Sequence, residues 1–251
     1  MPAVHRQYTR ELYAEFHYFA TWMPNVGLSL GDVGVLRDHR FDRMTSLTEM
    51  GVSFTSLEHP GRAEYSYSST GKVEISVDGA LSAPALPGGD SSVALTVAFS
   101  DACATYFRAA QCRSAVIGEL PKLARDLREL RQAGEWRPEY VVVTEVVRAG
   151  PAVVLVSNQA GARARLRVTA DSLPVPGIGA GGGLGASVAS GLAASVIVAD
   201  GEVTPLFRAA KLRRARGTNP RLIVRGPAAD PGLVGASWDD FAGDPDTSGQ
   251  G

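Results

Sequence analysis

The chain of 251 residues is long enough to bury a full hydrophobic core, either as one domain or as a domain with a tail. Its hydrophobic content of 45% and charged content of 20% are typical of a soluble globular protein. The formal net charge is −1, so the overall charge gives no reason to expect binding to nucleic acid or membranes.

The C-terminal part has a more uneven charge than the chain as a whole. The segment 226–251 contains aspartates and no Lys or Arg. Such a change of sign is typical of an interaction or regulatory region. The preceding basic residues fit a solvated face, nucleic-acid phosphates or anionic lipid headgroups. Between 203 and 225 there is no acidic residue, and the basic ones are Arg208, Lys211, Arg213, Arg214, Arg216, Arg221 and Arg225.

Two cysteines, Cys103 and Cys112, are too few for a disulfide framework and favour a reducing cytoplasm. We expect both to be structural thiols, because no histidine stands beside them in the sequence to activate a thiolate. The first residues, MPAVHRQYTREL, lack the apolar stretch of a signal peptide. No segment has the pattern of a conventional transmembrane helix.

In chain order, the first predicted element is an amphipathic helix over 4–19, with Tyr8, Leu12, Phe16 and Phe19 on one stripe. Short strands and turns are predicted over 28–54, where DHRFD forms a hairpin turn.

The clearest β pattern lies in KVEISVDGAL (72–81) and SSVALTVAFS (91–100). Apolar and polar residues alternate in both, so each strand has one apolar and one polar face. The turn-forming sequence APALPGGDSS between them predicts a long antiparallel hairpin. Such a hairpin either covers a core on one face or meets lipid on one side and water on the other.

A second helix is predicted over 103–133, with Pro121 in its first turn and Gly134 as C-cap. Two strands are predicted in 138–157 and another in 162–171. The segment 202–216 fits a strand or a short helix, and 219–226 fits a last strand. Helix, strands, helix and strands together predict an α+β domain. The apolar face of the second helix consists of Leu120, Leu123, Leu127 and Leu130.

The segment 171–200 has no charged residue between its terminal aspartates. Gly177, Gly179 and Gly182 match G-x-G-x-x-G, but a dinucleotide loop needs a strand directly before it, where this chain has two prolines. A flexible loop remains the alternative.

No catalytic or metal-binding pattern stands out, so we expect neither an enzyme nor a cofactor. His5 and His17 fall in the first helix, and His39 and His59 fall in turns where we expect them to be solvated. No nucleophile elbow, Walker A or zinc motif is present.

The order of these segments resembles the pore-forming domain of gasdermins, particularly the short bacterial ones. The matching pieces cover about residues 26–212. They are FDRMTSLTEMGVSF, the hairpin GKVEISVDGAL…SSVALTVAF, the helix IGELPKLARDLRELRQAG followed by EYVVVTEVVRA, VVLVSNQAGARARLRVTAD, the glycine-rich stretch and GEVTPLFRAAKL.

The resemblance implies a twisted, mainly antiparallel sheet with flanking helices and two long β-hairpins. It also implies a cytoplasmic, autoinhibited monomer that a protease activates. The freed domain, 1–225, would bind lipids of the inner membrane, form a homo-oligomer and extend its hairpins into a β-barrel pore. The resulting cell death would serve phage defence, and no nucleic-acid partner is implied.

Residue roles follow from the same resemblance. The tail 226–251 would be autoinhibitory through Leu233, Val234, Trp238 and Phe241. Arg208, Lys211, Arg213 and Arg214 would bind headgroups, and Arg216, Arg221 and Arg225 are cleavage candidates. The lipid-facing residues would be Val73, Ile75, Val77, Val93, Leu95, Val97, Phe99, Leu166, Val168, Val196 and Val198.

The chain departs from bacterial gasdermins in having no cysteine near its N-terminus, which puts lipidation in doubt. Two other functions remain open. One is a soluble binding or scaffold protein of the α+β class that never inserts into a membrane. The other is an enzyme with a nicotinamide cofactor at the G-x-G-x-x-G motif.

Overall fold

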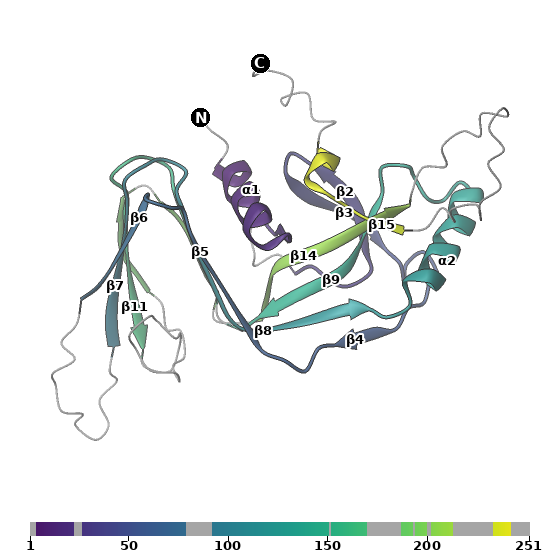
Figure 1. Ribbon diagram of the computed structural model, residues 1–251, viewed down its shortest axis with the longest axis horizontal. Helices are drawn as coiled ribbons and strands as arrows, with labels where there is room; N and C mark the ends of the chain where they lie inside the picture. Colours follow the sequence, from purple (N-terminus) through teal and green to yellow (C-terminus); the bar gives the residue numbers. More distant parts are fainter. Residues whose placement is uncertain are drawn as a thin grey trace, which may run out of the picture. The chain divides into compact units, whose positions relative to one another are not determined.

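The computed structural model describes residues 4–22, 27–78, 92–150, 152–169, 187–192, 194–199, 202–212 and 233–241 (Figure 1). The chain divides into two compact units. The first comprises 1–27, 59–114 and 147–206, and the second comprises 28–58, 115–146 and 207–251. Three strands contribute residues to both units, namely β8 (Thr105–Ile117), β9 (Val141–Ala149) and β14 (Val203–Leu212).

The strands form two sheets, and every strand pair whose register is described is antiparallel. The larger sheet has the order β1-β14-β9-β8-β10-β13. The smaller sheet has the order β12-β11-β7-β6. With the two α-helices found among the described residues, this is the α+β, mainly antiparallel class that the sequence predicts.

The other strands in the order of the larger sheet are β1 (Phe19–Ala20), β10 (Ala152–Ser157) and β13 (Ala194–Ala199). Five more strands pair with members of the larger sheet. β4 (Ser56–Glu58) and β5 (Ala63–Ser68) pair with β8, β2 (Asp32–Arg37) pairs with β9, β3 (Arg40–Ser46) pairs with β2, and β15 (Leu233–Gly235) pairs with β14. Those of the smaller sheet are β12 (Ser187–Leu192), β11 (Arg163–Thr169), β7 (Ser92–Phe99) and β6 (Val73–Asp78).

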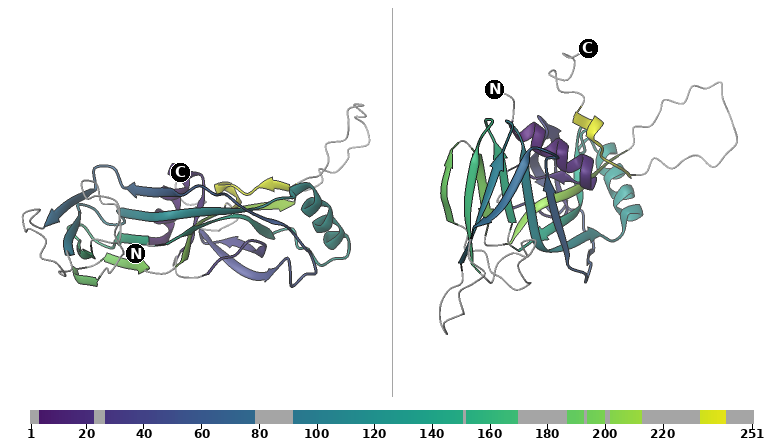
Figure 2. Two further views of the ribbon diagram at one scale, coloured as in Figure 1. Left: turned by 90° about the horizontal axis from the view of Figure 1, so that it is seen from below. Right: turned by 60° about the vertical axis from the view of Figure 1, so that its left-hand side comes forward.

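Helix α1 (Val4–Phe16), drawn in purple in Figures 1 and 2, belongs to the first unit and packs against β1 and β10. Tyr8 and Leu12 are completely buried and pack in one cluster with Phe107. The helix ends earlier than the periodicity predicts, because His17 takes a left-handed conformation with φ 56° and donates its backbone N–H to Tyr13 O at 2.9 Å. Phe19 therefore lies in β1 rather than on the helix.

Helix α2 (Leu120–Gln132) belongs to the second unit, with Pro121 in its first turn as predicted. Leu123 and Leu127 are buried against residues of β2 and β9, and Leu130 packs beside them. Leu120, predicted on the same face, is exposed because it is the first helical residue. Of the helices in the described ranges, none combines the length and apolar character that crossing a bilayer requires.

The prediction of helix over 103–133 is wrong for its first half, because 105–117 forms β8. This strand pairs with β5 on one side and β10 on the other. From Thr105 to Ala110 every residue is buried, so neither a period of two nor a period of 3.6 is visible. Sheet pairing overrides the helical preference of a segment containing Ala109 and Ala110.

Of the segment 202–216, which fitted a strand or a short helix, residues 203–212 form the strand β14, and 213–216 lie outside the described residues. The β6–β7 hairpin is confirmed, with Val73 opposite Phe99 and Val77 opposite Leu95. The predicted strand 219–226 and the G-x-G-x-x-G motif lie outside the described residues.

Candidate functional site

The smaller sheet brings the predicted lipid-facing residues of three strands onto one face. Ile75 pairs with Val97, which pairs with Ala164, and Val77 pairs with Leu95, which pairs with Leu166. Directly paired residues share a face of a sheet. The register therefore places nine of the predicted positions on this face. They are Val73, Ile75, Val77, Val93, Leu95, Val97, Phe99, Leu166 and Val168.

This apolar face is part of a hydrophobic core in the structure. Leu95, Val97, Phe99 and Leu166 are buried in a cluster that includes Leu155. The cluster joins β7 and β11 to β8 and β10 of the larger sheet. Ile75 is 41% exposed, because β6 is the edge strand. The apolar face is therefore the inner face of the small sheet.

The remaining two predicted positions lie in the other sheet. Val196 is paired with Leu155, and Val198 is paired with Val153. Leu155 and Val153 both belong to the buried cluster between the two sheets, described above for Leu95, Val97, Phe99 and Leu166. The predicted set is thus divided between two sheets that border one core.

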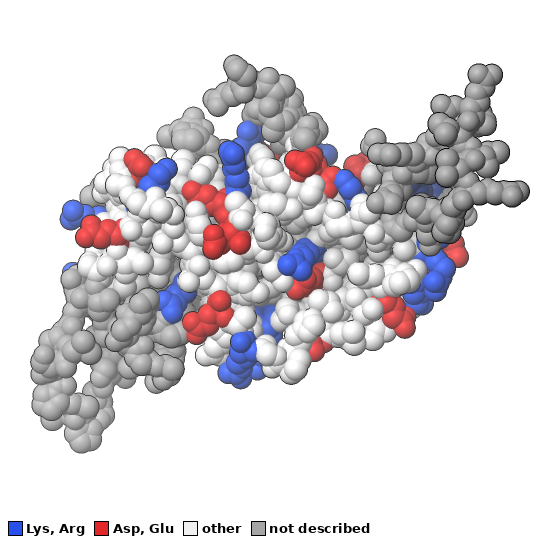
Figure 3. Space-filling model, in the orientation of Figure 1, with Lys and Arg blue, Asp and Glu red and all other residues white. Residues whose placement is uncertain are grey.

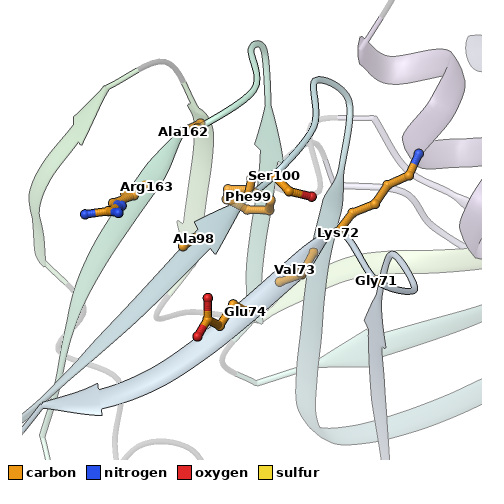
Figure 4. A pocket seen from close by; sticks show the side chains of 10 residues that line it. Gly71, Lys72, Val73, Glu74, Ala98, Phe99, Ser100, Ala162 and Arg163 are labelled. Atoms are coloured by element: carbon orange, nitrogen blue, oxygen red, sulfur yellow. The ribbon is translucent and has the colours of Figure 1, made fainter.

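The opposite face of the small sheet is polar. Glu74 pairs with Ala98 and Ala98 with Arg163, while Ser76 pairs with Thr96 and Thr96 with Arg165. A hollow of about 350 Å³ is lined by Ala98 together with Lys72, Glu74 and Arg163. In Figure 4 the side chains of Lys72 and Arg163 point in different directions and do not converge on a common point. The hollow therefore lacks the convergent polar groups of a catalytic site.

A charged side chain lies on the core-facing side of β8. Arg108 lies two residues from both Tyr106 and Ala110 along β8, so the three residues share one face of the strand. Arg108 also pairs with Val153, and Tyr106, Ala110 and Val153 all belong to the cluster between the two sheets. Its side chain is 10% exposed, and Nη2 lies 3.7 Å from Glu64 Oε2, beyond hydrogen-bonding distance. The Nε atom is buried without a hydrogen-bond partner in the described structure. Burial of this guanidinium is therefore compensated only in part, by the Glu64 carboxylate and by a hydrogen bond with the Tyr106 hydroxyl.

Replacing Arg108 by methionine will increase the free energy of unfolding by about 1–2 kcal/mol, because an apolar chain of similar length avoids the desolvation cost. Urea denaturation measures the change. The matched control is Arg113→Met on the same strand, where the side chain is exposed and the change stays within about 0.5 kcal/mol. A lower stability of Arg108→Met would show that the guanidinium contributes net stabilisation.

The C-terminal segment continues the larger sheet within the second unit. Strand β15 pairs with the end of β14, with Lys211 opposite Val234 and Leu212 opposite Leu233. Ala236 N donates to Ala209 O at 2.8 Å. Leu212 and Leu233 are therefore direct neighbours across the sheet.

After β15, a 3-10 helix, η1 (Trp238–Phe241), packs on the turn between β2 and β3. The Trp238 ring stacks on His39 at a centroid distance of 4.9 Å, and the Phe241 ring lies 5.0 Å from the same imidazole. Phe241 is 3% exposed and His39 is 8% exposed. The expectation that His39 is solvated is wrong, because the C-terminal segment covers the turn that carries it.

An ion pair also holds η1. Lys211 Nζ contacts Asp240 Oδ1, and Asp240 Oδ2 accepts a hydrogen bond from Ser237 N at 2.8 Å. The second predicted headgroup ligand on β14, Arg208, lies 3.2 Å from Glu145 Oε2. Both basic side chains therefore face carboxylates in this structure.

The other predicted residues of this region, Arg213, Arg214, Arg216, Arg221 and Arg225, lie outside the described residues. On the face in Figure 3, the described Lys and Arg side chains are mixed with Asp and Glu side chains. Among the described residues, that face shows no broad basic surface.

The two thiols are poorly suited to nucleophilic chemistry. Burial raises the pKa of Cys112 to about 12 and also raises the pKa of Cys103, with the Glu11 charge acting in the same direction. Both thiols are thus held in the protonated form near neutral pH. Within the described ranges, no group of three or more His, Cys, Asp or Glu side chains could hold a metal ion.

Sequence reasoning missed the polar contacts of Glu11 and Ser69. Ser69 follows β5 directly and is 3% exposed, and its hydroxyl donates to Glu11 Oε2 at 2.8 Å. Nothing in the sequence marks either residue, because they are 58 positions apart. Arg108 was detectable only as a charge between the apolar residues of β8.

No protein-family model matches the chain, and no curated protein matches it. One solved structure to which the chain is similar is described as "Cryo-EM structure of the Gasdermin A3 membrane pore". The two chains are 12% identical and superpose with a TM-score of 0.39. The alignment covers 86% of this chain and 93% of the other.

Proposed function

We propose that this chain is a pore-forming protein of the gasdermin type, stored in an autoinhibited form and activated by proteolysis. The domain 1–225 would insert into the membrane, and the tail 226–251 would prevent insertion until a protease cuts between about Leu206 and Gly226. The cut would release a domain that binds inner-membrane lipids, assembles with further copies and permeabilises the bilayer. In a bacterial cell this would cause death, as phage defence requires.

The observation that carries the proposal is the register of β6, β7 and β11. It combines one apolar face and one polar face across three strands, with Val97 on the first and Thr96 on the second. A strand that separates lipid from water needs this alternation. The apolar face is now covered by β8 and β10, and acyl chains would replace that cover after insertion.

The strands would also have to lengthen. β6 has 6 residues and β7 has 8, whereas a tilted membrane-crossing strand needs about 9–11. The connecting sequences 79–91 and 170–186 would supply the additional residues. Both contain several glycines, and neither contains a lysine or arginine.

The second support is the docking of β15 and η1. They occupy hydrogen-bonding groups of β14 and the ammonium group of Lys211. Removal of the segment would expose a strand edge available to another chain and would take Asp240 away from Lys211, whose ammonium group could then contact a lipid phosphate. The same role is proposed for Arg208, Arg213 and Arg214, and the cut would fall at Arg216, Arg221 or Arg225.

Three lengths of the chain test the proposal, namely 1–225, 1–241 and 1–251. The shortest lacks β15 and η1, whereas 1–241 retains both. Expression of 1–225 should reduce bacterial viability, and the purified domain should release dye from vesicles of bacterial lipid. The chains 1–241 and 1–251 should do neither.

Equal growth with all three chains, together with a folded 1–225 that releases no dye, would exclude the pore. That result would favour a soluble binding or scaffold protein. Circular dichroism of 1–225 is needed beside the leakage measurement, since an unfolded domain would also fail to act. The proposed function involves no enzymatic step and no cofactor, and both absences remain predictions.

A further inference from the structure

We propose that Glu11 and Ser69 form a latch that couples α1 to the turn from β5 to β6. The coupling belongs to the folded chain and can be measured without a membrane. Its role in activation rests on the proposed function, because β6 is the first strand of the hairpin that would leave the core.

The turn 69–72 is where the chain passes from the larger sheet to the smaller one. β5 pairs with β8 in the larger sheet, and β6 pairs with β7 in the smaller sheet. Lys72 N donates to Ser69 O at 3.0 Å, which closes the turn. Any movement of β6 away from β8 and β10 must change the backbone at this turn.

Ser69 connects the turn to β8 through two hydrogen bonds and to α1 through a third. Ser69 N donates to Thr105 O at 2.9 Å, and Thr105 N donates to Ser69 Oγ at 2.9 Å. The hydroxyl proton is therefore available for a third partner, which is Glu11 Oε2 at 2.8 Å. The hydroxyl both accepts and donates, so neither of its hydrogen-bonding roles is left to water.

The second carboxylate oxygen of Glu11 has a hydrogen-bond partner within α1 itself. Gln7 Nε2 donates to Glu11 Oε1 at 2.8 Å, so the two carboxylate oxygens have different partners. Glu11 lies next to Leu12, which is completely buried, and this fixes the helix face that carries the carboxylate. A hydrogen bond to a charged acceptor is about twice as strong as a neutral one.

These contacts make the two movements interdependent. Displacement of α1 would take the carboxylate acceptor away from the buried Ser69 hydroxyl, whose remaining side-chain partner is Tyr67, and opening of the turn would remove a donor from Glu11. A polar group left buried and unpaired is costly. By thermodynamic reciprocity, release of either element favours release of the other by the same factor.

Hydrogen exchange of the full-length chain tests the coupling. Ser69→Ala should increase exchange about tenfold both in the α1 amides and in residues 70–76, since a charge-assisted hydrogen bond is lost. Glu11→Ala should produce the same two increases. The double variant should exchange no faster than the faster single variant, because both changes remove one interaction.

Glu15→Gln is the matched control, because Glu15 is an exposed carboxylate on the same helix and its loss should change neither segment. Faster exchange in α1 alone, with residues 70–76 unchanged, would overturn the latch. If Ser69→Ala does not fold, Glu11→Gln keeps the shape of the side chain and should still increase exchange in both segments. An effect of Glu11→Gln confined to one segment would likewise overturn the proposal.

Vesicle leakage separates this inference from the proposed function. In the 1–225 chain, Ser69→Ala and Glu11→Ala should shorten the lag before dye release several-fold. Coupled exchange without any leakage from 1–225 would retain the latch and reject the pore. Leakage from 1–225 without coupled exchange would retain the pore and reject the latch.

Discussion

Replacing Val97 by aspartate will lower the free energy of unfolding by at least about 3–5 kcal/mol. Val97 is completely buried in the core between the two sheets, where a carboxylate finds no partner that could repay its desolvation. Urea denaturation gives the stability, and vesicle leakage of the 1–225 chain gives the activity. The same substitution should abolish leakage, because the carboxylate would face acyl chains after insertion.

The matched control for this prediction is Ser76→Asp on the neighbouring strand. Ser76 is exposed on the polar face, so the added carboxylate would meet water in the folded chain and in an inserted strand. Its stability and leakage should stay close to those of the unsubstituted chain. Loss of activity in both variants would contradict the assignment of the two faces. Loss of activity at Val97 counts as evidence for insertion only if that variant still folds.

Full-length chain carrying Phe241→Ala will dock its C-terminal segment about a hundredfold less tightly. Truncation of a buried phenylalanine costs about 3 kcal/mol, which corresponds to roughly two powers of ten in the docking equilibrium. Phe241 contacts His39 and Trp238, so Trp238→Ala should weaken docking in the same direction. Hydrogen exchange at the end of β14 reports the loss of β15 pairing. Under the proposed function, either variant should reduce bacterial viability without proteolysis.

Asp239→Ala is the control, because Asp239 lies in the same 3-10 helix but is exposed. Its exchange at Ala210–Leu212 should match that of the unsubstituted chain. Unchanged exchange in Phe241→Ala would show that β15 stays paired without the aromatic contacts. Faster exchange with full viability would show that the segment is released but does not restrain a toxic domain.

The parts of the fold that the sequence predicts well are those with a single exposed face. β6 and β7 alternate because one face of the sheet meets solvent, and α2 shows a helical period for the same reason. The first half of the predicted helix 103–133 failed because β8 is buried on both faces from Thr105 to Ala110. A segment without a solvent face has no periodicity to detect.

Some features of the candidate site could also be predicted from local sequence, and others appear only in the structure. The shared apolar face of β6, β7 and β11 could be predicted strand by strand, because alternation is local, and its contact with lipid stays a prediction. The structure adds that β13, with Val196 and Val198, belongs to a different sheet from β11, with Leu166. Burial of His39 could not be predicted, because it depends on Trp238 and Phe241 near the other end of the chain.

By itself, the sequence determined the α+β class, the two-faced hairpin strands, the second helix and the apolar residues of the tail. These features depend on neighbours within about ten residues, and their periodicity is therefore visible in one chain. Only the tertiary structure decided that the apolar hairpin face is buried, that β15 pairs with the end of β14, and that Ser69 meets both Glu11 and Thr105. Those contacts join residues tens of positions apart, and chain topology, rather than local preference, determines which of many polar side chains meet.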